Sequence, residues 1–307
     1  MVMTANRTIC CSAKLPPQDA ARLGLFTEIN SLELQRRQAD VLAMARSFHL
    51  PFDFCEWPGL YGGQTGRLNI AAIDPALREL SIACIEHAMQ EACKAARIEI
   101  AVMHLAPRYW REDDWVYRPS SPPPPATVGE YAILIESIRR LGRMAAGLGI
   151  RLAMENNRAY WDGIDDGADF AAVDRTLVRE YFGTSPFEWL QIWHDAAMPS
   201  VGLCLDTSHA TTCVHRFGPD RRPAMLDAFL ACGQAIWHVH WNGNTPDHPD
   251  GRKDRHMPLG TDTLGDRFHQ AILDLPARFH LLEHFTDVPT LQKELAYIAG
   301  LKGQERQ

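Results

Sequence analysis

The chain has 307 residues, of which 46% are hydrophobic and 22% are charged, and its formal net charge is -7. These proportions are those of an ordinary globular protein, and the acidic balance disfavours nucleic acid as a partner. The eight cysteines follow no regular spacing, and no apolar run is long enough to span a membrane. We therefore expect a soluble, cytoplasmic protein with reduced thiols.

Short strand-like runs alternate with helical patterns along the whole chain, which is typical of consecutive βα units and a parallel sheet. In chain order, the predicted strands cover residues 8–13, 25–30, 51–57, 98–105, 151–156, 201–206, 236–241 and 278–285. The predicted helices cover residues 18–23, 32–48, 74–96, 128–148, 187–197, 225–232, 264–273 and 291–301.

Two of the boundaries have a clear local cause. Asp74 followed by Pro75 opens a long helix, because Asp is a favoured N-cap and Pro fits the first helical turn. A glycine-rich loop is predicted over 59–66. A proline run at 120–125 lies between a predicted strand and the next helix, which favours a long βα loop over an interdomain linker.

Eight strands that alternate with helices predict an α/β protein with a single closed (β/α)8 TIM barrel over residues 1–307. The alternative is an open, doubly wound sheet. That fold is disfavoured because the residues after the first strand, SAKLPPQ, contain no glycine-rich phosphate-binding fingerprint.

The stretch SVGLCLDTSHA, residues 200–210, ends an apolar run in side chains that bind protons and metals. Asp206 falls at the predicted strand end and His209 follows three residues later. The C-terminal strand ends of such barrels carry the active site, and Asp and His are ligands for divalent cations. The alternative is that Asp206 caps the next helix, with His209 in its first turn.

Side chains alternate along a strand, so residues of equal parity face the same side. By this rule, each of the last four predicted strands carries a row of inward-facing side chains that ends in a ligand-type residue. These four residues are expected to converge near the barrel axis: Glu155, Asp206, His240 and Glu283. They suit Mn²⁺, Co²⁺, Mg²⁺ or Zn²⁺; the alternative is a set of separate caps and salt bridges. Further candidate ligands are His104, His209, Asp254 and His256, with Glu56 weaker. His238 is expected to pack below the site, and His280 and His284 to face the outer helices.

At these residues the sequence resembles the xylose-isomerase-like TIM-barrel superfamily, which holds sugar isomerases, epimerases and endonuclease IV. The resemblance rests on LNIAAIDPALRELS, VMHLAP, LAMENN, VGLCLDTSHA, HVHWNGN, DRHMPLG and LLEHF. In the epimerases one metal is held by residues that match Glu155, Asp206, His240 and Glu283, and the two glutamates exchange protons with the substrate. The three-zinc ligands of endonuclease IV would fall on the same four residues and on His104, His209, Asp254 and His256. This chain departs from endonuclease IV at the third strand, where Glu56 replaces a histidine, and after the fifth, where ENNRAYW replaces a small segment.

The leading hypothesis is a metal-dependent isomerase or epimerase that acts on a sugar, keto-sugar or polyol through an enediolate. Glu155 and Glu283 would transfer the protons. Trp57, Trp110, Trp115 and Trp241 are candidate stacking walls for a sugar ring. The alternatives are a zinc phosphoesterase of the endonuclease IV kind, and a lyase or dehydratase on the same metal site. The partner is then a small carbohydrate; the oligomeric state stays open, a homo-oligomer included.

Overall fold

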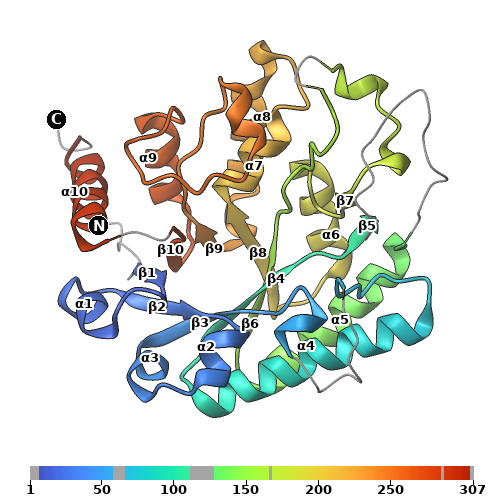
Figure 1. The fold of residues 1–307 in the computed structure, drawn as a ribbon, viewed down its shortest axis with the longest axis horizontal. Helices are drawn as coiled ribbons and strands as arrows, with labels where there is room; N and C mark the ends of the chain where they lie inside the picture. The colour runs from blue at the N-terminus through green and yellow to red at the C-terminus, as the bar shows by residue number, and fades with distance from the viewer. Residues whose placement is uncertain (1–6, 58–65, 111–127, 166–167, 285–286, 305–307) are drawn as a thin grey trace.

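A closed barrel of parallel strands forms the centre of the molecule (Figure 1). The computed structural model describes residues 7–57, 66–110, 128–165, 168–284 and 287–304. The strands follow one another around the barrel in the order β1-β10-β9-β8-β6-β4-β3-β2, and this closure confirms the predicted (β/α)8 fold. The barrel strands are β1 (Thr8–Ser12), β2 (Phe26–Ile29), β3 (Ala45–His49), β4 (Ile100–His104), β6 (Arg151–Glu155), β8 (Val201–Asp206), β9 (Ile236–His240) and β10 (Phe279–Leu282).

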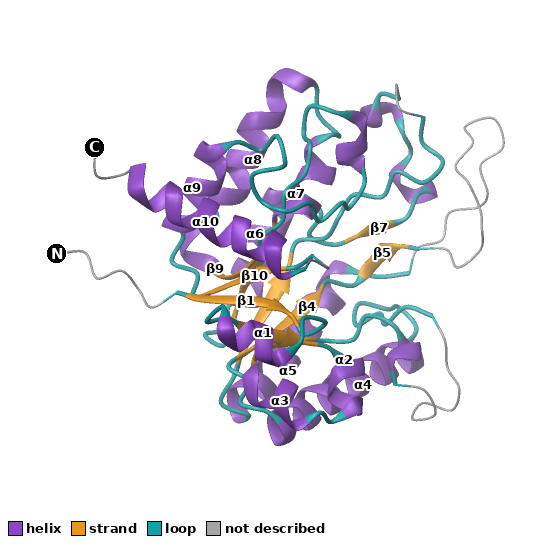
Figure 2. Cartoon of the chain, turned by 60° about the vertical axis from the view of Figure 1, so that its left-hand side comes forward, coloured by secondary structure: helices purple, strands orange, loops and turns teal. Residues whose placement is uncertain are grey.

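Helices lie around the outside of the barrel (Figure 2). They are α1 (Pro17–Arg22), α2 (Ser31–Arg36), α3 (Ala39–Met44), α4 (Pro75–Ala95), α5 (Tyr131–Gly147), α6 (Pro186–Ala196), α7 (Thr207–Val214), α8 (Arg222–Leu230), α9 (Asp266–Asp274) and α10 (Val288–Gln304). Short 3-10 helices are η1 (Phe54–Glu56), η2 (Phe170–Ala172), η3 (Arg175–Leu177), η4 (Pro219–Arg221), η5 (Gly233–Ala235) and η6 (Pro249–Arg252). Two short strands outside the barrel, β5 (Pro107–Tyr109) and β7 (Glu180–Tyr181), pair in antiparallel fashion. In the described part of the chain, no helix has both the length and the apolar character that crossing a membrane requires.

The predicted start of α4 is confirmed. The Asp74 side chain accepts a hydrogen bond from the Ala76 N–H at 2.9 Å, and Pro75 occupies the first turn. The eight cysteines are free thiols, as expected for a chain without a disulfide framework. The predicted glycine-rich loop, except its last residue, and the proline run lie outside the described residues.

The region of the third strand differs from the prediction. Residues 32–48, predicted as one helix, form α2, α3 and most of β3, while the predicted strand 51–57 contains η1 and an isolated bridge from Asp53 to Arg67. Arg37 has a φ of 51° and ends α2 in the left-handed region. β3 then pairs with both β2 and β4, which buries Phe48 completely. A five-residue strand directly after a helix keeps the helical spacing of apolar residues, so periodicity alone could not separate the two.

The interior of the barrel is filled by side chains from alternate strand positions. Ala153, Cys204 and Leu281 belong to one buried interior cluster, as the parity rule predicts. Trp237 packs against this cluster and lies so close to Gly202 that a Cβ there would overlap the indole ring. The barrel is thus packed below its C-terminal strand ends, and the open space lies above them.

Candidate metal centre

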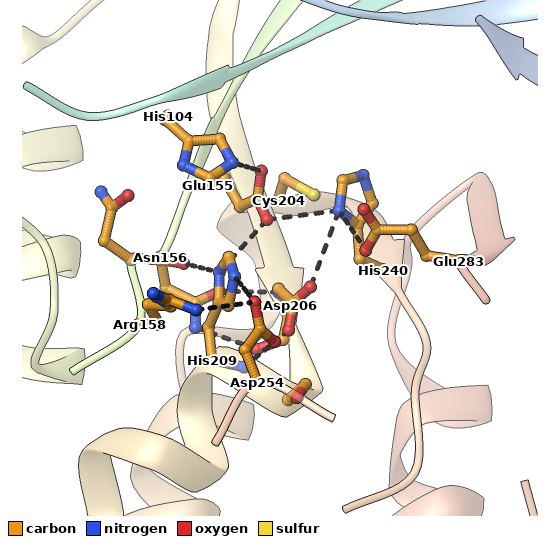
Figure 3. Close-up of polar contacts among 12 residues, drawn as sticks. His104, Glu155, Asn156, Arg158, Cys204, Asp206, His209, His240, Asp254 and Glu283 are labelled. Carbon is orange, nitrogen blue, oxygen red and sulfur yellow. Dashed lines mark hydrogen bonds and ion pairs between the residues drawn. The ribbon is translucent and has the colours of Figure 1, made fainter. Parts of the chain in front are cut away.

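Histidines and carboxylates from five barrel strands, from the position directly after a sixth, from helix α7 and from one loop meet at the C-terminal end of the barrel (Figure 3). The closed register places the strand ends next to one another around the axis, since Asp206 is paired with His240 and Glu155 with His104. The members are His49, His104, Glu155, Asp206 and His240 at the ends of their strands, Glu283 directly after β10, His209 in α7, and Asp254 and His256 after η6.

The four residues predicted to end the inward-facing rows do converge. His240 Nδ1 lies 3.3 Å from Glu155 Oε1, 3.2 Å from Glu283 Oε2 and 3.8 Å from Asp206 Oδ2. Glu155, Asp206 and His240 are at most 1% exposed, whereas the Glu283 side chain is 26% exposed and faces the open space above. The set is therefore one cluster rather than separate caps and surface salt bridges. We call these four residues the central group.

Asp206 also caps a helix, as the alternative interpretation of this residue predicts. Its Oδ1 accepts the His209 N–H at 2.7 Å at the start of α7. Asn156 fixes the same segment, because its side chain donates to the Asp206 carbonyl at 2.9 Å and accepts the Asp206 N–H at 2.6 Å. One carboxylate oxygen of Asp206 is thus used by the backbone, and the other faces His240. Asn156 belongs to the ENNRAYW segment, whose Arg158 lies 3.8 Å from Asp254.

Two further groups adjoin the central one. Glu155 Oε2 lies 3.4 Å from His49 Nε2 and 3.2 Å from His104 Nε2. On another side, Asp254 lies 3.2 Å from His209 Nε2 through Oδ2 and 2.8 Å from His256 Nε2 through Oδ1. In each group the potential ligand atoms lie within 4.8 Å of one another: His49, His104 and Glu155; Glu155, Asp206 and His240; Asp206, His209, Asp254 and His256. Glu155 and Asp206 are shared between groups.

His49 is the member that sequence reasoning missed. The third strand ends at His49, so the expected departure from endonuclease IV at this strand, with Glu56 in place of a histidine, is wrong. Glu56 lies in η1, where its Oε1 accepts the Phe52 N–H at 2.8 Å. The sequence held one usable signal: His-Leu with a proline directly or shortly after it occurs twice, as HLP at His49 and as HLAP at His104.

Burial and neighbouring charges shift the pKa values of several groups in this cluster. Burial raises the pKa of Asp206 to about 7, and the like charge of Glu283 acts in the same direction. Burial also opposes the ionisation of Glu155, but the imidazoles of His104 and His240 hold its pKa well below the usual range. The pKa of His240 lies well above its ordinary value despite burial, because neighbouring acidic groups favour the charged form. Buried carboxylates in such number need a positive partner, a role that a divalent cation fills.

The donor set fits such a cation. Among the described residues, Glu155 Oε2, His240 Nδ1 and His256 Nε2 are buried and make no hydrogen bond of good geometry, although they lie at ion-pair distances from their neighbours. Carboxylate oxygen and imidazole nitrogen are the ligands that Mn²⁺, Co²⁺ and Zn²⁺ take in proteins. Each of these atoms faces another potential ligand: Glu155 Oε2 faces His49 and His104, His240 Nδ1 faces Glu283, and His256 Nε2 faces Asp254.

A pocket of about 510 Å³ opens above this cluster. Its lining also includes Lys14, Asn30, Leu32 and Phe52, so a ligand would contact polar and apolar groups besides the carboxylates. The volume is in the range of small-molecule sites.

Of the tryptophans predicted as aromatic walls, the three that the structure describes do not line this pocket. Trp241 is fully buried and donates through Nε1 to His269 at 2.9 Å, and Trp57 is buried against His87. Trp110 is not among the residues that line the pocket, and Trp115 lies outside the described residues. Of the aromatic side chains in the described part, Phe52 lies on the wall.

The other histidine predictions are confirmed. His238 lies buried below the central group, with its Nε2 3.1 Å from Glu28. His284 faces α10, where its Nε2 lies 2.6 Å from Glu294, and the His280 ring lies 5.7 Å from that of Trp241.

Comparisons with known proteins agree with this fold. A family model described as a xylose isomerase-like TIM barrel matches residues 33–301. A D-tagatose 3-epimerase-like protein is 17% identical, with a TM-score of 0.62 over 95% of this chain and 98% of that one. A protein from Thermus thermophilus, in crystals soaked with ZnCl2, is 22% identical, with a TM-score of 0.59 over 98% and 100% of the two chains. The 3-keto-D-glucoside 4-epimerase from E. coli is 13% identical, with a TM-score of 0.61 over 96% and 99%. A comparison with curated protein sequences finds no match.

Proposed function

The chain belongs to the xylose isomerase-like TIM barrel family, and from that premise we propose that it is a metal-dependent isomerase or epimerase of a small carbohydrate. The observation that carries the proposal is the approach of two glutamates, Glu155 and Glu283, to the same atom, His240 Nδ1, beneath a pocket of about 510 Å³. Structural neighbours that are named as sugar epimerases support it. The substrate class is a sugar, keto-sugar or related polyol.

The central group of Glu155, Asp206, His240 and Glu283 would hold the ion. A divalent ion supplies Lewis acidity, which acidifies a carbon-bound hydrogen next to a carbonyl. Glu283 borders the pocket, and the facing imidazoles of His240 and His256 outweigh burial and lower its pKa to about 2, so it is present as the carboxylate that could accept that proton. Asn242 Nδ2 lies 3.3 Å from Glu283 Oε2 and fixes its orientation. Return of a proton from Glu155 to the opposite face of the substrate would invert the configuration at that carbon, and return to the neighbouring carbon would give an isomer.

Solvent exchange at carbon tests this proposal. The purified chain, loaded with Mn²⁺, Co²⁺, Mg²⁺ or Zn²⁺, is incubated in D2O with a panel of ketoses and inososes, and deuterium is located by NMR and mass spectrometry. We expect incorporation next to the carbonyl, and a loss of orders of magnitude in Glu283→Gln, which keeps an oxygen for the ion but removes the base. The metal content of the variant, measured in parallel, is expected to fall much less. Product analysis separates isomerisation from the lyase or dehydratase alternative.

A second candidate is a zinc phosphoesterase of the endonuclease IV kind, and one observation favours it. His49 and His104 build a group beside the central one, and Asp254 with His256 builds another, so three adjoining groups are present instead of one. Two or three zinc ions acting together would activate water against a phosphate ester. Three zinc equivalents per chain, with cleavage of abasic DNA or a phosphate ester and no deuterium exchange into any sugar, would replace the isomerase proposal by this one.

A further inference from the structure

Glu28, on β2, links two histidines inside the barrel. Its Oε1 lies 3.2 Å from His240 Nε2, and its Oε2 lies 3.1 Å from His238 Nε2. Both histidines are fully buried and Glu28 is 7% exposed, so this carboxylate lies at the junction of the packed interior and the pocket. The mechanism described above makes no use of it.

The protons of this chain of groups can be assigned. Each oxygen of Glu28 is directed at the Nε2 of one imidazole, at ion-pair distance but without ideal hydrogen-bond geometry. A carboxylate accepts hydrogen bonds, so this arrangement favours a proton on Nε2 of both rings. The Nδ1 of His238 lies 3.7 Å from Cys204 Sγ, where it can accept from the thiol.

The position of this proton determines which nitrogen of His240 can bind a cation. Its Nε2 faces Glu28 at 3.2 Å and is the nitrogen that would carry the proton, so the nitrogen available to a cation is Nδ1. That nitrogen is the one directed at Glu155 and Glu283, at 3.3 and 3.2 Å. A histidine with the opposite tautomer would turn an N–H toward the central group and could not bind an ion there.

We propose that Glu28 is a positioning residue of the metal centre: it holds the Nε2–H of His240 and so presents Nδ1 as the ligand atom. Its negative charge also raises the basicity of that ligand, as carboxylates behind metal-bound histidines do. Burying a carboxylate between two imidazoles costs desolvation free energy, which packing alone does not offset. A role in supporting a metal ligand would explain why a carboxylate occupies this position. This inference rests on the metal site of the proposed function.

Glu28→Gln tests the role with almost unchanged shape. A glutamine has one acceptor oxygen and one NH2 donor, so it can accept from only one of the two imidazoles. Where it donates to His240, that ring must carry its proton on Nδ1 and loses its ligand atom. Chelator competition is expected to show Co²⁺ and Zn²⁺ affinity reduced by about 10- to 100-fold, with an altered visible spectrum of the Co²⁺ form.

The matched control is His238→Phe, from the same network and equally buried. The phenyl ring can keep the stacking on Phe279, and Glu28 still accepts from His240. We therefore expect a change in thermal stability, but a Co²⁺ spectrum like that of the wild type and a Co²⁺ affinity within a factor of about three of it. This change is much smaller than the loss expected for Glu28→Gln.

A measurement on the wild-type chain makes the result independent of how the variants fold. In ¹⁵N-histidine-labelled protein saturated with Zn²⁺, His240 is expected to show a protonated Nε2 and a zinc-shifted Nδ1. Zinc on Nε2 would overturn the inference, and so would a folded Glu28→Gln with wild-type affinity and spectrum. Failure of the wild-type chain to bind Zn²⁺ or Co²⁺ would remove the proposed function and this inference together, whereas equal binding by Glu28→Gln would remove only the role of Glu28.

Discussion

Asp206→Asn is expected to separate the two roles of this side chain. Asn caps a helix about as well as Asp, so the hydrogen bond from the His209 N–H, 2.7 Å long in the native chain, should survive. The substitution removes the negative charge that faces His240 at 3.8 Å. We expect the variant to keep its fold, to lose tight metal binding, and to be more stable than the wild type when metal is absent.

The size of the stability gain follows from the pKa of Asp206. Burial raises this pKa from 3.8 to about 7, so the folded state binds more protons than the unfolded state between these values. The metal-free wild type therefore loses stability as the pH rises from about 4 toward 7, by about 4 kcal/mol once ionisation is complete. The amide of the variant does not ionise, but its NH2 group must share space with the Asn242 side chain, which lies 3.4 Å from Asp206 Oδ2. A net gain of about 1–3 kcal/mol above pH 7 is expected after this cost.

Urea denaturation in the presence of EDTA, at pH 8 and at pH 4, measures the gain, and chelator competition measures the affinity for Zn²⁺. The advantage of the variant should shrink at pH 4, where the wild-type carboxyl is protonated in the folded state. Asp206→Ala is the control, because it also loses the cap and should be less stable than Asp206→Asn by about 1 kcal/mol. Destabilisation of Asp206→Asn at pH 8, together with unchanged zinc affinity, would refute this reasoning.

Three further predictions concern binding, packing and acid stability. His240→Ala should abolish tight binding at the central group, with a wild-type circular dichroism spectrum; unchanged metal content by elemental analysis would contradict this. Gly202→Ala should cost about 1–3 kcal/mol in urea unfolding, because the added methyl group would overlap the Trp237 ring. His215 is 5% exposed and burial lowers its pKa to about 4. Its stabilising contribution is thus complete above about pH 6.5 and lost as the pH falls toward 4, by about 3 kcal/mol; His215→Gln should flatten the unfolding profile over that window.

The barrel strands from β4 onward could be predicted from the sequence, because each is a largely apolar run that ends at, or directly before, a polar residue of the central region, whereas the short strands β5 and β7 were not predicted. β8 is the clearest case, since its run from Val201 ends in Asp206, which caps α7 and faces the central group. β3 is not an apolar run that ends in a polar residue, because Arg46 and Ser47 lie inside it. Its five residues follow α3 without a loop, and its identity as a strand depends on pairing with β2 and β4, which is a tertiary interaction. The error placed the third strand end at Glu56, so His49 was not among the predicted ligands.

The parity rule predicts which side chains face inward. It does not predict which residues of neighbouring strands lie at the same level along the barrel axis. On β2 the rule pairs Glu28 with Phe26, and Phe26 does pack against the interior cluster, so the inward direction of Glu28 follows from the sequence. Which strand end lies level with which is set by the register, and here Cys10 pairs with Phe26 while Phe279 pairs with His238. Only this closure puts the carboxylate of β2 between the two histidines of β9. A residue that supports a ligand from behind is therefore visible in the sequence as an inward polar side chain, but its partner is decided by the barrel as a whole.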